Sequence, residues 1–153
     1  MRRDNINGLA TTIGYLIIFL LNATWGIIQT SLGLLLFIYF INRPHYLYKG
    51  SIVTTSARPR TFHFEGGIST ELFIFVTHDI KKEQINDSNS IKHEYGHCLQ
   101  STLLGPLYLI IIGIPSLIWM IFFRNWRMQH NKKYMSWVYT EFWADRWGKV
   151  NRD

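Results

Sequence analysis

The 153-residue chain lacks features that define several protein classes. It has a single cysteine, Cys98, so no disulfide can form within the chain, which fits a reducing or thiol-indifferent compartment. Acidic residues are also few, and ten Asp and Glu against 16 Lys and Arg give a net charge of +6. Such an excess suits nucleic acid or an anionic membrane surface. No nucleic-acid-binding motif is recognisable, so we expect a lipid bilayer as partner and no nucleic acid.

Charged residues are missing from one long stretch, because no Asp, Glu, Lys or Arg occurs between Gly8 and Ile41. The stretch is too long for one membrane-spanning helix, and Asn22–Gly26 is the expected break. A helical hairpin and a tilted helix followed by an interfacial helix both remain open. Basic residues flank the stretch on both sides and are missing from its turn: Arg2, Arg3, Arg43 and Lys49. This pattern favours a hairpin, with both ends cytoplasmic.

A cleaved signal peptide is the competing interpretation of this N-terminal region. A second apolar run follows the first, and no small-residue cleavage site precedes a polar region, so a retained anchor is favoured. We therefore expect residues 1–42 to form a hydrophobic helical hairpin that anchors the chain in a membrane.

After Arg43 the sequence consists of short segments whose composition is typical of β-strands. Ser51–Thr55 and Ile68–Val76 are rich in Val, Ile, Phe and Thr, with Thr61–Phe64 as a third possible strand. Glu65–Gly67 is the expected turn before the second segment. A small sheet is predicted here.

The motif His93-Glu94-Tyr95-Gly96-His97 is the strongest chemical signal in the chain. On a helix, His93 and His97 lie one turn apart on one face, where both can bind one zinc ion, and Glu94 is then the candidate general base. An amphipathic helix with two hydrogen-bonded histidines is the alternative. Ser88 or Ser90 is the expected N-cap, and the helix should end near Leu104. Cys98 points away from this face and is expected to be a small buried residue.

A third metal ligand is expected, because two histidines and water hold zinc poorly. Glu141 is the candidate, and Asp145, four residues later on the same helical face, can accept a hydrogen bond from a ligand histidine. Two histidines and one glutamate are a known catalytic zinc ligand set. Without the upstream motif, Glu141 and Asp145 would indicate only a solvated helix face.

These residues carry a resemblance to a known family. His-Glu-x-x-His followed by Glu-x-x-Ala-Asp resembles the gluzincin metallopeptidases, and looks most like the membrane-embedded branch that contains the CAAX prenyl proteases and bacterial heat-shock membrane proteases. The shared residues are His93, Glu94, His97, Glu141, Ala144 and Asp145. The motif, together with Gly105-Pro106 and Gly113-Ile114-Pro115-Ser116, is also similar to a group of small bacterial membrane proteins with no assigned activity.

The gluzincin resemblance implies a mechanism and leaves one part of it open. Glu94 would deprotonate a zinc-bound water that attacks a peptide carbonyl, and would then pass the proton to the leaving amine. A donor to the oxyanion is also needed. Several residues qualify, and the sequence does not choose among them: Tyr95, His130, Tyr134, Tyr139 and Arg146.

The uncharged segment Ser101–Phe123 lies between the two halves of this site and is long enough to cross a membrane. A full crossing would separate Glu141 from His97, whereas both must reach one zinc ion. Gly105-Pro106 and Gly113–Pro115 supply helix breaks, so a re-entrant or partly buried helical pair is expected. Five tryptophans of the last third fit helices at the headgroup level or a packed core: Trp119, Trp126, Trp137, Trp143 and Trp147.

The sequence thus predicts a mainly helical α+β membrane protein with a small sheet, an HExxH helix and a C-terminal ligand helix. Residues 43–153 are expected to form a zincin-like domain. The predicted function is zinc-dependent peptide hydrolysis at the cytoplasmic side of a bacterial inner membrane, with the chain integral to that membrane and a peptide or protein as substrate. The alternative is a non-catalytic membrane protein whose zinc site serves stability or partner binding.

Overall fold

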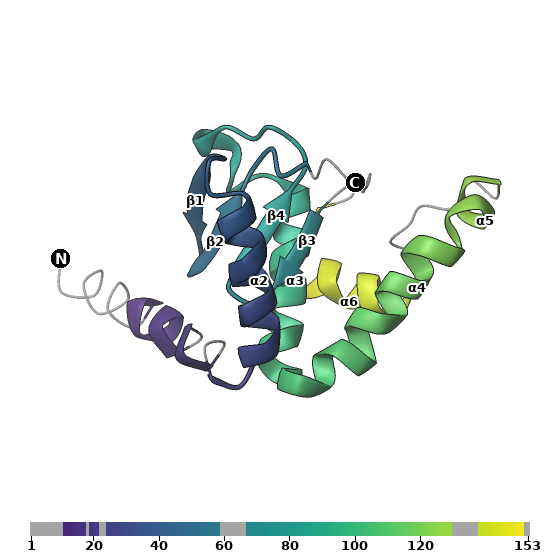
Figure 1. Cartoon of the computed structure of the whole chain (residues 1–153), viewed down its shortest axis with the longest axis horizontal. Helices are drawn as coiled ribbons and strands as arrows, with labels where there is room; N and C mark the ends of the chain where they lie inside the picture. The colour runs from purple at the N-terminus through teal and green to yellow at the C-terminus, as the bar shows by residue number, and fades with distance from the viewer. Residues whose placement is uncertain (1–10, 18, 22–23, 59–66, 130–137, 152–153) are drawn as a thin grey trace.

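A small mixed sheet lies at the centre of the computed structural model, which describes residues 11–17, 19–21, 24–58, 67–129 and 138–151 (Figure 1). The strand order is β1-β2-β4-β3. β2 pairs with β1 antiparallel and with β4 parallel, and β3 pairs antiparallel with β4 at the other edge. The four strands are β1 (His45–Tyr48), β2 (Ser51–Thr54), β3 (Gly67–Thr70) and β4 (Phe73–Val76). The fold is α+β, as the sequence predicts.

The central strand β4 separates two hydrophobic cores. Ile74 and Val76 pack on one side with residues of helix α3 (Asn89–Leu104), while Phe73 and Phe75 pack on the other side. Side chains alternate between the faces of a strand, so these two cores lie on opposite faces of the sheet. Helix α2 (Ile27–Tyr39) covers the second face through Leu36 and Phe37. The sheet is therefore enclosed between α2 and α3 (Figure 1).

The strand predictions are partly confirmed. β2 matches the expected segment, but Ile68–Val76 is wrong as a single strand because the chain reverses at Glu71 and Leu72 to make the β3–β4 hairpin. The sequence analysis does not predict β1. It is joined to β2 by Lys49 and Gly50, both with positive φ (48° and 86°), which is typical of a tight two-residue hairpin. Thr61–Phe64 lies outside the described residues.

Helix α3 begins and ends as its sequence predicts. Ser88 is the N-cap, and its hydroxyl accepts a hydrogen bond from the Ile91 amide at 3.4 Å. The helix ends at Leu104, and Gly105 follows with a φ of 52°, a conformation that glycine adopts without strain. The His-Glu-Tyr-Gly-His motif thus lies in the middle of a regular helix.

The apolar segment after α3 contains one sharp bend. The chain bends by 118° between the arms Asn89–Leu107 and Leu109–Trp119, two residues after the predicted Gly105-Pro106 break. The second predicted break, at Gly113–Pro115, does not occur. A π-helix, η3 (Leu109–Gly113), continues directly into α4 (Ile114–Phe122), so Pro115 lies within a continuous helical stretch, two residues after the π-helical turn.

Two short apolar helical segments precede the sheet. Residues 11–17 and 19–21 are helical, and α2 follows after a turn at Trp25 and Gly26, within the predicted Asn22–Gly26 break. Among the described residues, no single helix has both the length and the apolar character needed to cross a bilayer; only the bent pair named above meets both criteria when its arms are combined. The N-terminal membrane anchor stays a prediction.

Candidate metal centre

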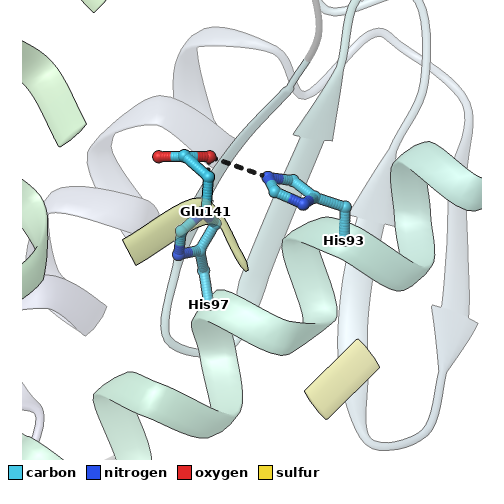
Figure 2. Close-up of side chains that lie close together, drawn as sticks. All are labelled: His93, His97 and Glu141. Carbon is cyan, nitrogen blue, oxygen red and sulfur yellow. Dashed lines mark ion pairs between the residues drawn. The ribbon is translucent and has the colours of Figure 1, made fainter. Parts of the chain in front are cut away.

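Helices α3 and α6 (Tyr139–Gly148) bring together the three predicted metal ligands. His93 and His97 lie one turn apart on α3, and Glu141 reaches them from the first turn of α6 (Figure 2). The Glu141 Oε2 atom is 3.1 Å from His93 Nε2 and 3.4 Å from His97 Nε2. One ligand atom from each residue lies within 4.8 Å of the other two, and all three residues are buried. This group could hold a metal ion.

Small residues allow the two helices to approach this closely. A Cβ atom added at Gly96 would lie 1.9 Å from the Ala144 carbonyl oxygen, and one added at Gly148 would lie 1.9 Å from the Lys92 carbonyl oxygen. Both contacts are with backbone, so a side chain could be fitted only by separating the helices. The glycine inside the motif therefore sets the distance between the histidines and Glu141.

Hydrogen bonds fix the orientation of both imidazole rings. His93 Nδ1 lies 2.8 Å from Asp145 Oδ1, and His97 Nδ1 lies 2.8 Å from Gln100 Oε1. A carboxylate oxygen and an amide oxygen are acceptors, so each Nδ1 carries the proton and donates it. When the rings are neutral, each Nε2 then presents a lone pair toward Glu141. Asp145 has the position that the sequence predicts.

Burial and hydrogen bonding favour a positive charge between the two histidines and Glu141. Burial alone would lower the pKa of His93, but hydrogen bonds to Asp145 and Glu141 outweigh it and raise that pKa to about 10. Burial would raise the pKa of Glu141, yet the hydrogen bonds from His93 and His97 hold it well below its usual range. A buried carboxylate opposite two imidazole nitrogens requires a proton or a metal ion between them. The donor set of two nitrogens and one carboxylate fits zinc.

Gln100 is a residue of the candidate metal centre that the sequence interpretation missed. It is fully buried, accepts from His97 and donates through Nε2 to the Thr140 carbonyl oxygen at 3.1 Å. It therefore links the second histidine to the residue before Glu141. The available signal was its spacing, since Gln100 follows His97 by three residues and lies on the same face of the helix.

Substituting Gln100 with Leu should weaken zinc binding about 10- to 100-fold, because His97 loses the acceptor that orients its ring. Competition with a chromophoric chelator measures the affinity. The matched control is Gln84→Leu at an exposed position of the short helix η1 (Lys82–Gln84), which should leave affinity unchanged. Equal zinc affinity in a folded Gln100→Leu protein would show that this hydrogen bond does not orient the ligand.

Glu94 lies between the ligand residues in sequence and against the sheet in space. Its side chain is buried and packs on Gly67 of the edge strand β3, where an added Cβ would lie 2.7 Å from Glu94 Oε1. Glycine at this position leaves room for the carboxylate. The negative charge of Glu94 also helps to raise the pKa of His93, after the larger effects of Asp145 and Glu141. Glu94 is therefore held between the edge strand and the metal centre.

The apolar segment Ser101–Phe123 contacts Glu141 through a chain of hydrogen bonds. Ser116 of α4 donates a hydrogen bond to Thr140 Oγ1 at 2.9 Å, and that hydroxyl is 3.4 Å from Glu141 Oε1. The Tyr139 hydroxyl donates to the Ile111 carbonyl oxygen. The segment thus brings α6 back beside α3, as a shared metal site requires. Its re-entrant course in a membrane stays a prediction.

The structure places three of the five candidate oxyanion donors. Tyr95 is buried in the core between α3 and the sheet, in edge-to-face contact with Tyr48, and so does not face the metal ligands. Tyr139 already donates to Ile111, and Arg146 is exposed. His130 and Tyr134 lie outside the described residues. Cys98 is buried in the same core as Tyr95, as expected.

Comparison with known proteins adds no relative. The chain matches no protein-family model, no curated protein and no solved structure.

Proposed function

We propose that the protein is a zinc-dependent peptidase in which His93, His97 and Glu141 hold the metal. The observation that carries the proposal is the buried convergence of two Nε2 atoms on the Glu141 carboxylate, with each Nδ1 atom bonded to a separate acceptor. Metal-binding histidines in zinc enzymes are oriented in this way by a second hydrogen bond.

The chemistry divides between the metal and Glu94. When bound, a zinc ion supplies a Lewis acid that polarises a carbonyl and makes water more acidic. Glu94 follows the first histidine and is not one of the three converging ligands, so it can accept a proton from the attacking water and donate it to the departing amine. Its contact with Gly67 limits where the carboxylate can lie.

The edge of the sheet offers a place for a peptide substrate. Among the strands of the described residues, β3 pairs with β4 alone, and its four residues are partly buried. An extended peptide can add to such an edge through backbone hydrogen bonds. Because Gly67 of β3 touches Glu94, a peptide bound along this edge would pass beside the candidate base. A purely structural role for the strand is the alternative.

Metal analysis combined with a cleavage assay tests the proposed function. The purified full chain should contain one zinc ion and should cleave a library of unstructured peptides. A strong chelator should stop cleavage, and added zinc should restore it. Cleavage that persists in metal-free protein would contradict the proposal, as would a protein that binds no zinc.

A non-catalytic zinc site is the second candidate function. It is supported by the links that tie the ligands to three elements, since Asp145, Gln100 and Ser116 hold the centre from α6, α3 and α4. In that case zinc would raise the stability of the fold. Zinc-loaded protein would then be more resistant to unfolding and would cleave no peptide.

The burial pattern of α2 supports a lipid partner. Its buried residues are Gln29 and Gly33, whereas six large apolar side chains are exposed: Ile27, Ile28, Leu32, Leu34, Leu35 and Ile38. A helix of a water-soluble protein has the opposite arrangement. Exposed apolar side chains continue on α4: Ile114, Leu117, Ile118, Ile121 and Phe122. A bilayer with an anionic cytoplasmic face would cover these side chains and attract the net positive charge.

Vesicle binding tests the lipid partner. The wild-type chain should associate with vesicles that contain anionic lipid, and Leu35→Lys should weaken this association, because Leu35 is 66 % exposed on the apolar face of α2. Gln84→Lys adds the same charge at a polar, exposed position and should not weaken it. Equal binding by all three proteins would argue against α2 as a lipid contact.

A further inference from the structure

A second polar cluster lies away from the metal centre, between α2, the β3–β4 turn and the last turn of α3. Three residues contribute buried oxygen atoms that have no hydrogen-bond partner among the described residues: Gln29 Oε1, both carboxylate oxygens of Glu71, and Ser101 Oγ. Gln29, Glu71 and Ser101 are at most 2 % exposed. Buried polar atoms without partners are uncommon, and several in one place need an explanation.

Two glycines let α2 pack closely against the β3–β4 turn. An added Cβ at Gly26 would lie 1.8 Å from Glu71 Oε1, and one at Gly33 would lie 2.3 Å from Thr70 Oγ1. Gln29 lies on the same face between the two glycines, and its Nε2 donates to the Gly105 carbonyl oxygen at 2.8 Å. That bond fixes the amide, so Gln29 Oε1 remains available. Ser101 is close enough to lower the pKa of Glu71 without completing a hydrogen bond.

Glu71 is an unfavourable residue at this position unless it has a ligand. Its φ is 56°, in the left-handed region where glycine is preferred. Its carboxylate is buried, and no basic side chain in the described part of the chain pairs with it. A buried charge normally pairs with an opposite charge or coordinates a cation. Glu71 therefore combines a strained backbone, a buried carboxylate and the lack of a described basic partner.

We infer that Glu71, Gln29 and Ser101 form a site for a monovalent alkali-metal cation. The available atoms are all oxygens, which are the ligands of hard cations. One carboxylate balances one positive charge, whereas a divalent ion would leave a buried net charge. The site also lies at the C-terminal end of α3, where the helix dipole favours a cation. Such an ion would join α2 to the body that carries the metal centre.

A proton on Glu71 is the competing occupant. Burial raises the pKa of Glu71 to about 7, and the titratable groups that face it, Cys98 and Tyr108, have pKa values raised well above their usual ranges by burial. At pH 8 these two neighbours are neutral. A proton would give the cluster one new donor, whereas a cation accepts lone pairs from the Glu71, Gln29 and Ser101 oxygens at once. The two occupants respond differently to salt and to pH.

Thermal unfolding of the full chain at pH 8 distinguishes a bound alkali-metal cation from a proton on Glu71. At equal ionic strength, the unfolding midpoint should be about 2–4 °C higher in saturating sodium or potassium chloride than in choline chloride, and the effect should saturate with cation concentration. Glu71→Gln should remove this difference and keep zinc binding, while Glu83→Gln, at an exposed carboxylate, should retain the difference. Ser101→Ala keeps the charge, removes one ligand, and should raise the cation concentration needed.

The outcomes that overturn the inference are distinct. Equal midpoints in alkali-metal and choline salts for the wild-type chain would mean that no specific cation binds, whatever the variants do. Stabilisation on acidification from pH 8 to pH 6, reproduced at pH 8 by Glu71→Gln, would identify a proton as the occupant. The inference is independent of peptide hydrolysis, because its readout is cation-specific stability.

Discussion

Replacing Glu94 with Gln is expected to abolish peptide cleavage while leaving zinc bound. The amide has nearly the same size as the carboxylate, so it fits against Gly67, but it cannot accept the proton of the attacking water. Loss of a general base slows a reaction about 100- to 10,000-fold. The turnover number for peptide cleavage and the zinc content of the same preparation provide the test.

Glu141→Gln is the matched comparison, since it makes the same chemical change at a ligand. Glu141 Oε2 faces both histidine Nε2 atoms, so this variant should lose zinc as well as cleavage. Glu83→Gln, at an exposed glutamate of η1, should change neither property. Full cleavage by Glu94→Gln would remove Glu94 from the mechanism. Loss of zinc in Glu94→Gln would make it a structural residue of the metal centre.

Replacing Gly96 with Ala should disrupt the metal centre although no ligand is changed. The new Cβ would lie 1.9 Å from the Ala144 carbonyl oxygen, and this backbone atom can move only if α6 moves away from α3. Overpacking of this kind costs about 1–3 kcal/mol of folding free energy. Because Glu141 lies on α6, the same displacement should weaken zinc binding. Chemical unfolding and zinc competition measure the two effects.

Gly113→Ala is the control for this substitution. Gly113 is also helical, but the nearest atom to an added Cβ is 3.5 Å away, on the flexible Leu109 side chain, so alanine fits there. This variant should keep the stability and zinc affinity of the wild-type chain. If Gly96→Ala behaves in the same way, the approach of α6 to α3 is looser than the structure indicates.

The candidate metal ligands could be predicted from sequence because their geometry is mostly local. His93 and His97 share a helix, so their spacing fixes their common face, and Ser88 marks where that helix begins. Glu141 could be proposed only through the chemistry of a third ligand. Its actual position depends on the bend after Leu104 and on the close contact at Gly96, which are properties of the folded chain.

Other features could not be predicted because they depend on contacts between distant segments. The β3–β4 turn looks like the middle of a strand in sequence. Glu71 adopts a left-handed conformation there that its residue type disfavours, so the residue type does not signal the turn. The role of Gln100 emerges only when Thr140 lies beside it. The polar inner face of α2 likewise becomes apparent only when Gln29 meets Gly105.

The central claim is that His93, His97 and Glu141 bind one zinc ion together. Anomalous X-ray scattering at the zinc edge, from crystals of the zinc-loaded full chain, tests it most directly. The account predicts one strong peak per chain, with both histidine Nε2 atoms and a Glu141 oxygen at about 2.0–2.2 Å. A peak elsewhere, no peak at full zinc loading, or a peak bound by the histidines with Glu141 turned away would contradict the account.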